Sequence, residues 1–198
     1  MPELVVVPTG TANLASVVAA FRRLGAEPVV TAEPAAIRAA SHVMLPGVGT
    51  FAAAMARLIA AGADAALRER IAADRPTMAI CVGHQLLFER SDESPGVRGL
   101  GIVAGPVERF PAAVRVPQFG WNEVEAQEEC DLLDSGYAYF ANSHRATAAP
   151  GWKLATAEHG GRFIAAIERG KVIGTQFHPE LSGAYGAALL SRWLTLAC

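Results

Sequence analysis

The chain has 198 residues, with 17 Lys and Arg against 19 Asp and Glu and a formal net charge of −2. A hydrophobic fraction of 52% and a charged fraction of 18% exclude a disordered chain. The absence of a basic excess argues against nucleic-acid binding. The length predicts a single domain over residues 1–198, so a second active site would have to lie on another chain.

No targeting or membrane-spanning segment is predicted. The N-terminus lacks a basic stretch before its apolar run, and charged residues interrupt the longest apolar region, 51–67. Three cysteines, Cys81, Cys130 and Cys198, are too few and too far apart for a disulfide scaffold or a zinc site. We expect a cytoplasmic protein without a metal, in which Cys130 and Cys198 are incidental and one cysteine is free to react.

The first half of the chain alternates between short apolar runs and helical patterns. Strands are predicted at 4–7, 28–31, 43–45 and 77–80. Helices are predicted at 14–24 (with Asn13 as its cap), 34–40, 51–60, 64–74 and 83–90. Such alternation predicts a mostly parallel sheet with helices on both faces.

The second half has shorter runs that are separated by Gly and Pro. Strands, some of them antiparallel, are predicted at 102–107, 114–116, 137–142, 152–157, 163–168 and 172–176. A final helix is predicted over 183–196. The fold class is therefore α/β, with a central mostly parallel sheet flanked by helices and additional antiparallel strands in the second half.

Cys81 stands where a buried strand is followed at once by a helix. This pattern is typical of a nucleophile elbow, a sharp turn that exposes a reactive side chain above the sheet. Ala79 and Gly83 are small enough for such a crowded turn. The N–H groups of the helix favour the thiolate, and the N–H of Val82 would face a developing oxyanion. The alternative is a buried structural cysteine.

Five histidines are available as the base for such a thiol. His42 and His159 are expected at the surface, His84 is expected to pack in the core, and His144 could line a pocket. The fifth, His178, stands at the end of a predicted strand and is treated separately.

His178 is followed by Pro179 and Glu180. Proline biases the residue before it toward an extended conformation, in which residues i and i+2 face the same way. Glu180 is therefore expected to orient the imidazole, as the acid of a catalytic triad does. The alternative is a strand-end turn with a solvated Glu180. Together with Cys81, the pair forms a Cys-His-Glu set that predicts nucleophilic catalysis.

Around these residues the sequence resembles the class I glutamine amidotransferases. The matching motifs are Ala-Ile-Cys-Val-Gly-His-Gln at 79–85 and Phe-His-Pro-Glu at 177–180. Further segments resemble the glutaminase subunits of imidazole glycerol phosphate synthase, namely 9–17, 45–49, 90–94, 119–122 and 139–143. The likeness extends from Thr9 to the final helix.

The resemblance implies a glutaminase reaction without a cofactor or metal. Cys81 would attack the side-chain amide of glutamine, and His178, held by Glu180, would transfer the proton. Water would then hydrolyse the thioester to glutamate. The groups implied for the oxyanion and the substrate are Gly47, Val48, Gly49, Val82, Gln85 and the backbone near Ser143.

The resemblance also implies a partner. Ammonia would pass to a separate cyclase subunit, a (β/α)8 barrel, in a heterodimer of histidine biosynthesis, and neither nucleic acid nor a membrane is involved. Trp121 and Asn122 mark the expected partner-facing surface, with a core position for Trp121 as the alternative. In this family the oxyanion strand is thought to rearrange when the partner is ready, so the chain alone is expected to be a poor glutaminase.

Five positions depart from the family pattern. Ala79 replaces the usual glycine, and His84 replaces a methionine, although sister amidotransferases use histidine there. Asn142 and His144 stand where a histidine and an aromatic residue are more usual, which leaves the details of the substrate loop open. Leu181 stands where a basic residue is common, which leaves one polar contact with the cyclase open.

Three other interpretations remain. Residues 47–52 fit the Gly-x-Gly-x-x-Ala dinucleotide fingerprint with Asp64 or Glu69 as the ribose acid, although this spacing is short and the motif follows the third strand. A non-catalytic partner would keep the fold without the chemistry, but all three triad residues are present. The glutaminase of another synthase, for pyridoxal phosphate or guanylate, is disfavoured by 120–122 and by the missing Pro-Gly-Gly.

Overall fold

The computed structural model describes residues 3–10 and 14–197, so the expected cap Asn13 and the terminal Cys198 lie outside the described part. Its strands are β1 (Leu4–Val6), β2 (Val29–Val30), β3 (His42–Leu45), β4 (Thr77–Ile80), β5 (Phe88–Ser91), β6 (Val103–Arg109), β7 (Gln118–Ala126), β8 (Gly136–Asn142), β9 (His144–Arg145), β10 (Lys153–Glu158), β11 (Arg162–Arg169) and β12 (Val172–Thr175). Its helices are α1 (Leu14–Arg23), α2 (Pro34–Ala39), α3 (Phe51–Ala60), α4 (Ala63–Ala72), α5 (Val82–Leu86), the 3-10 helix η1 (Pro179–Leu181) and α6 (Gly183–Leu194).

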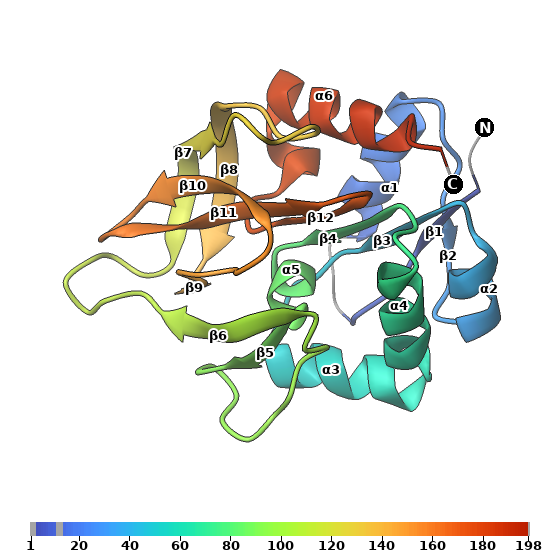
Figure 1. The fold of residues 1–198 in the computed structure, drawn as a ribbon, viewed down its shortest axis with the longest axis horizontal. Coiled ribbons are helices and arrows are strands. Elements are labelled where there is room, and N and C mark those ends of the chain that lie inside the picture. The colour runs from blue at the N-terminus through green and yellow to red at the C-terminus, as the bar shows by residue number, and fades with distance from the viewer. Residues whose placement is uncertain (1–2, 11–13, 198) are drawn as a thin grey trace.

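Five neighbouring strands of the main sheet are parallel, in the order β2-β1-β3-β4-β12. Figure 1 shows α1 and α6 on one side of this sheet and α3 and α4 on the other. Because both faces are covered, β1, β3, β4 and β12 consist entirely of buried residues. The predicted parallel sheet flanked by helices is confirmed.

The main sheet continues from β12 through β11, β10, β7 and β8, and each of these pairs is antiparallel. A second, three-stranded sheet has the order β5-β6-β9. The antiparallel strands predicted for the second half are thus confirmed. Because β3, β4 and β12 are parallel neighbours, the segments that follow them meet at one edge of the sheet, where the site lies.

Three local predictions differ from the structure. The helix predicted over 83–90 ends at Leu86, because the backbone of the next segment pairs with β6 and forms β5. The strand predicted over 114–116 is an irregular segment between Pro111 and Pro117, and proline has no N–H to donate to a ladder. Strand β7 was not predicted, because its polar side chains conceal its alternation of buried and exposed positions.

His42 is buried, so its expected surface position is wrong. Its side chain lies under α6, where the ring packs edge-on against Trp193 with centroids 4.9 Å apart. Its Nε2 lies 3.2 Å from the carbonyl oxygen of Trp193. His159 lies at the surface, as predicted, and is partly exposed. Its ring packs against Phe110, and its Nε2 lies 2.9 Å from the carbonyl oxygen of Arg115.

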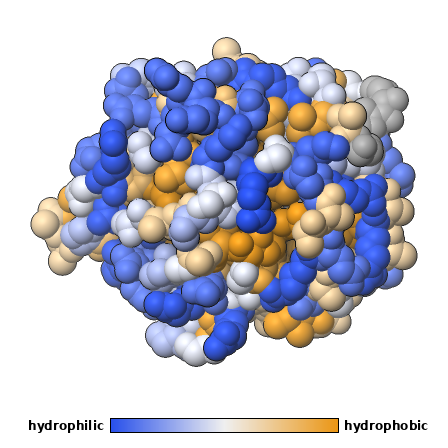
Figure 2. Space-filling view, in the orientation of Figure 1, coloured by the Kyte–Doolittle hydropathy of each residue, from blue (hydrophilic) through white to orange (hydrophobic). Residues whose placement is uncertain are grey.

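The surface seen in Figure 2 is largely hydrophilic, with hydrophobic residues visible between polar ones near the centre of this face. Scattered apolar side chains of this kind are normal on a folded protein. Within residues 3–10 and 14–197, no helix is long and apolar enough to cross a membrane.

Glu168 on β11 is a fully buried carboxylate that stabilises the antiparallel half. It accepts the backbone N–H groups of Asp131, Leu132 and Leu133 at 2.7, 3.0 and 3.1 Å. We expect Glu168→Gln to lower the free energy of unfolding by about 3 kcal/mol, because the amide loses the charge and one acceptor oxygen. Urea unfolding measures the loss.

The matched control is Glu125→Gln. Glu125 is exposed and forms an ion pair with Arg162 at 2.6 Å, and such surface pairs contribute less than about 1 kcal/mol. Equal losses in the two variants would contradict the structural role of Glu168.

Candidate active site

Cys81 lies at the corner between β4 and α5, as predicted. Its backbone has φ 54° and ψ −112°, a positive-φ conformation that costs free energy for a residue other than glycine. A Cβ atom on Gly83 would lie 2.0 Å from the carbonyl oxygen of Leu45, and one on Gly47 would lie 2.3 Å from the backbone nitrogen of Gly83. These two glycines let the segment after β3 approach α5 closely, which the sharp turn requires.

His178 and Glu180 follow β12 and contact each other. The Nδ1 atom of His178 lies 2.9 Å from Oε1 of Glu180, and both side chains are buried. The expected extended i, i+2 arrangement is wrong: His178 is extended, but residues 179–181 form η1, and Glu180 reaches the ring from this turn. The His178 backbone N–H donates to the carbonyl oxygen of Tyr139 at 2.9 Å, which anchors the turn to β8.

Cys81 and Glu180 both affect the charge of the His178 imidazole. Burial by itself lowers the pKa of His178, but hydrogen bonds and charge interactions with Cys81 and Glu180 raise it to about 10. The arrangement therefore favours a charged imidazole between two acidic groups. The second oxygen of Glu180, Oε2, is buried and has no hydrogen-bond partner in the described part of the chain.

The segment after β3 occupies the expected oxyanion position. The Val82 N–H donates to the carbonyl oxygen of Gly47 at 3.3 Å, so a substrate oxyanion could use this donor only after the carbonyl turns away. The cavity lined by this segment, Ile80, His178 and Glu180 has a volume of about 10 Å³, which is about the size of one water-sized sphere. This cavity beside His178 and Glu180 is too small to hold glutamine.

The segment after β3, residues 46–49, is held at both ends by side chains. The hydroxyl of Thr9 donates to the carbonyl oxygen of Pro46 at 2.8 Å. At the other end, Glu93 accepts the Phe51 N–H at 2.6 Å, and Ser94 accepts the next N–H of α3 at 3.2 Å. These side chains occupy the N–H groups that a dinucleotide phosphate would need, which argues against the dinucleotide interpretation.

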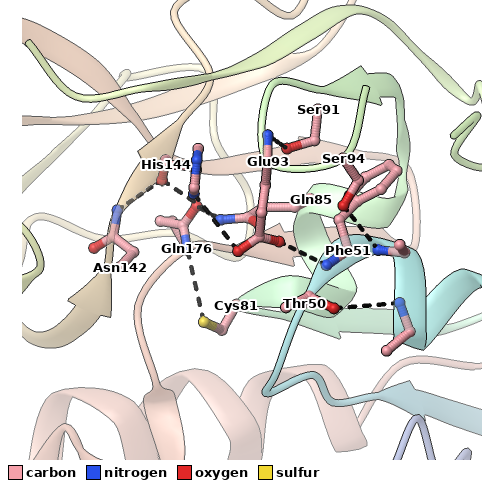
Figure 3. A network of polar contacts seen from close by, with 12 residues as sticks. Thr50, Phe51, Cys81, Gln85, Ser91, Glu93, Ser94, Asn142, His144 and Gln176 are labelled. Atoms are coloured by element: carbon pink, nitrogen blue, oxygen red, sulfur yellow. Dashed lines mark hydrogen bonds and ion pairs between the residues drawn. The ribbon is translucent and has the colours of Figure 1, made fainter. Parts of the chain in front are cut away.

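A buried polar network connects the nucleophile corner with β8 and β9 (Figure 3). Gln85 Nε2 donates to Oε1 of Gln176 at 2.9 Å and to the carbonyl oxygen of His144 at 3.4 Å. Asn142 donates to the same His144 carbonyl at 3.0 Å. Gln176 in turn donates to Sγ of Cys81 at 3.8 Å. Of the expected substrate residues, Gln85 thus lies in this network.

Two residues of the network were missed by sequence analysis. Gln176 is a lone amide in a buried apolar run, two residues before His178, and this pattern could have identified it. Glu93 lies in a matched segment, but its contacts with α3 and with His144, whose Nδ1 lies 3.9 Å from Oε1 of Glu93, depend on tertiary structure. The carbonyl oxygen of Ser143 accepts the N–H of Phe110 at 3.2 Å.

Several other titratable residues have structural surroundings. His84 packs against Phe88 with ring centroids 5.3 Å apart, and burial lowers its pKa to about 3, which confirms its predicted packing role. His144 is buried, and this burial lowers its pKa. Burial and the charge of Glu168 raise the pKa of Cys130 to about 11, so this thiol is not activated. Within the described ranges, no three His, Cys, Asp or Glu residues are arranged to hold a metal ion.

Comparison with known proteins is consistent with this fold. The family "Glutamine amidotransferase class-I" matches residues 5–195. The imidazole glycerol phosphate synthase subunit HisH of Symbiobacterium thermophilum is 38% identical over 203 residues, which cover 100% of this chain and 96% of the relative. The chloroplastic imidazole glycerol phosphate synthase hisHF of Arabidopsis thaliana is 40% identical over 193 residues, which cover 93% of this chain and 33% of that protein.

The fold is also that of a solved glutamine amidotransferase structure, with a TM-score of 0.77, 21% identity and 96% of both chains covered. The sharp turn at Cys81 and the family match define the class of the protein, which is a class-I glutamine amidotransferase. Within this class, the chain belongs to the family of imidazole glycerol phosphate synthase subunit HisH.

Proposed function

We propose that the chain is the glutaminase subunit of an imidazole glycerol phosphate synthase, with Cys81, His178 and Glu180 as its catalytic triad. The observation that carries the triad is the 2.9 Å contact between His178 and Glu180 at the end of β12, the strand that is paired with β4 next to Cys81. Hydrogen bonding with Cys81 and Glu180 also raises the pKa of His178 to about 10. The family membership supplies the substrate, glutamine, and the role in histidine biosynthesis.

The proposed reaction has two steps. The Cys81 thiolate attacks the carboxamide carbon of glutamine, a C–S bond forms, and the carbonyl oxygen becomes an oxyanion. The C–N bond then breaks as His178 gives its proton to the departing ammonia. In the second step His178 takes a proton from water, the hydroxide adds to the thioester, and the C–S bond breaks. Glutamine and water thus yield glutamate and ammonia.

The oxyanion needs donors that the resting conformation does not offer. We propose that the Gly47 carbonyl turns away during activation, which frees the Val82 N–H and directs backbone N–H groups of Gly47, Val48 and Gly49 toward the oxyanion. Gly49 already has a φ of 90°, a conformation that glycine adopts without strain. Gln85 and the backbone near Ser143 are proposed to hold the substrate.

The proposed partner is a cyclase subunit with a (β/α)8 barrel, bound as a heterodimer in the cytoplasm. Four side chains form a candidate contact surface, which we name the aromatic face: Phe119, Trp121, Tyr137 and Leu181, with exposed fractions of 70, 58, 59 and 41%. Strand register places the three aromatic residues on one face of β7 and β8, because Trp121 is paired with Tyr139. The exposure of Trp121 excludes its alternative core position.

The aromatic face adjoins the site. The Tyr139 carbonyl, on the strand pair that carries this face, accepts the His178 N–H. Large aromatic residues are enriched at the centres of interfaces. In the Arabidopsis relative this chain corresponds to about a third of a longer protein, and the HisH relatives carry the word subunit in their names. A synthase partner on this face would therefore lie beside the triad.

A glutamine hydrolysis assay with and without the cognate cyclase and its ligand tests this proposal. We expect slow turnover alone and at least a tenfold rise in the complex, because the Val82 N–H is engaged in the resting conformation. Trp121→Ala should weaken the complex about tenfold or more. Equal turnover with and without the cyclase would contradict the regulation, and co-purification with a different synthase would contradict the partner.

A further inference from the structure

Gln176 lies directly beside the nucleophile because of strand register. Thr175 on β12 is paired with Ile80 on β4, and the Cys81 N–H donates to the carbonyl oxygen of Thr175 at 2.8 Å. The next residues, Gln176 and Cys81, therefore stand side by side where both strands end. The Gln176 side chain is fully buried, so its amide must find its partners inside the protein.

The hydrogen-bond network fixes the orientation of the Gln176 amide. Its Oε1 accepts the N–H of Gln85 at 2.9 Å, and Gln85 Nε2 is also held by the carbonyl oxygen of His144. A flipped amide would place two NH2 groups against each other. The Nε2 of Gln176 is thereby directed at Sγ of Cys81, 3.8 Å away, as Figure 3 shows.

We propose that Gln176 is a further catalytic residue, whose amide N–H donates to the sulfur of Cys81 and stabilises its thiolate, and that Gln85 is the positioning residue that orients this amide. The inference rests on the proposed function in one respect, since it takes Cys81 as the nucleophile. A donor aimed at sulfur acts on the thiolate more than on the thiol, because hydrogen bonds to an ionised acceptor are stronger.

The Gln176 amide can donate a hydrogen bond to the sulfur throughout the reaction, whereas the His178 imidazole cannot. His178 must give its proton to ammonia and take another from water, so its charge changes during the reaction, whereas an amide donates at every stage. In the second step the C–S bond breaks and the sulfur leaves as a thiolate. Gln176 remains as a donor to this sulfur while His178 transfers protons.

The titratable groups on the elements around Cys81 are His178 and Glu180 after β12, His84 on α5, and the pair of His144 and Glu93 across the network. His178, backed by Glu180, interacts with the Cys81 sulfur from the end of β12. On α5, burial lowers the pKa of His84 to about 3, so this ring stays neutral at ordinary pH. Across the network, Glu93 lies beside His144. A shift of the Cys81 titration in a Gln176 variant would therefore report the loss of the neutral amide.

The test is a pH titration of the Cys81 thiolate by its ultraviolet absorbance. The chain carries Cys130→Ala and Cys198→Ala so that Cys81 is its only thiol, and the same chain with Cys81→Ser gives the blank. We expect Gln176→Leu to raise the titration midpoint by about one pH unit, which lowers the thiolate fraction about tenfold on the acidic side. Gln176→Glu should raise it further, because its carboxylate repels the thiolate.

Two further variants separate this role from loss of fold. Gln118→Leu removes another buried glutamine, which lies on β7 opposite Asn142. Because β11 and β10 separate β7 from β12, this variant should leave the midpoint unchanged. Gln85→Leu leaves Gln176 in place without its orienting partner and should raise the midpoint by less than Gln176→Leu does. Thermal unfolding confirms that each variant is folded at the temperature of the titration.

The outcomes are distinct. An unchanged midpoint in folded Gln176→Leu would overturn the proposal, as would an equal shift in Gln118→Leu. If Gln176→Leu does not fold, an unchanged midpoint in Gln85→Leu overturns it instead. The titration needs no glutamine, so a chain that fails to hydrolyse glutamine would overturn the proposed function and leave the Gln176 result intact.

Discussion

Cys81→Ser in the complex is expected to lower glutamine-dependent turnover by at least about 10⁴-fold. The hydroxyl that replaces the thiol is a far weaker nucleophile beside the same imidazole, and loss of a nucleophile typically costs this much or more. The measurement is glutamate release by the chain with its cyclase. Product formation from added ammonium should persist, because the proposed acceptor chemistry belongs to the partner.

The matched control for this variant is Cys130→Ser. Cys130 is half-buried and carries a pKa raised to about 11 by burial and by Glu168, so its thiol stays protonated and inactive. Turnover should be unchanged in this control. If Cys81→Ser retained most of its glutamine-dependent turnover, the triad assignment would be wrong.

His178→Gln is expected to lower turnover by about 10⁴-fold, because the amide fits the space but can neither donate a proton to ammonia nor take one from water. Activity at saturating glutamine measures the loss. The effects of Cys81→Ser and His178→Gln should not add in the double variant, since the residues act as a unit. His159→Gln, on the loop beyond β10, is the control for replacement of a histidine.

His178 should also make stability depend on pH. Its folded-state pKa of about 10 lies above the ordinary value of 6.5, so its protonated form stabilises the folded chain. This contribution is fully present below pH 6.5 and is lost as the pH rises through about 10. Urea unfolding across this range should show the decrease in the parent chain and a smaller one in His178→Gln. The same decrease in both chains would contradict the raised pKa.

Local sequence was sufficient for much of the fold and for the core of the site. Continuous β-branched runs are buried on both faces, so the parallel strands could be predicted, and amphipathic spacing identified the helices. The small residues around Cys81 indicated a sharp turn, and the two-residue spacing of His178 and Glu180 indicated a pair. The pair exists, although η1 rather than an extended segment forms it.

Other features depend on tertiary contacts, because their partners are distant in sequence. Strand β5 forms because it pairs with β6. Strand β7 forms because it pairs with β8 and β10, although its own sequence shows no strong strand pattern. His42 is buried because α6 covers it. None of these pairings can be inferred from the segment alone.

The conformation of the active site also depends on tertiary contacts. The sequence was sufficient to predict a thiol at a strand–helix corner and a His–Glu pair in a chain of 198 residues. In three dimensions the Val82 N–H donates to the Gly47 carbonyl, and strand register brings the Gln176 amide to the sulfur of Cys81. Neither contact can be predicted from the sequence. The reason is physical: a backbone carbonyl and a buried amide act through where neighbouring strands place them.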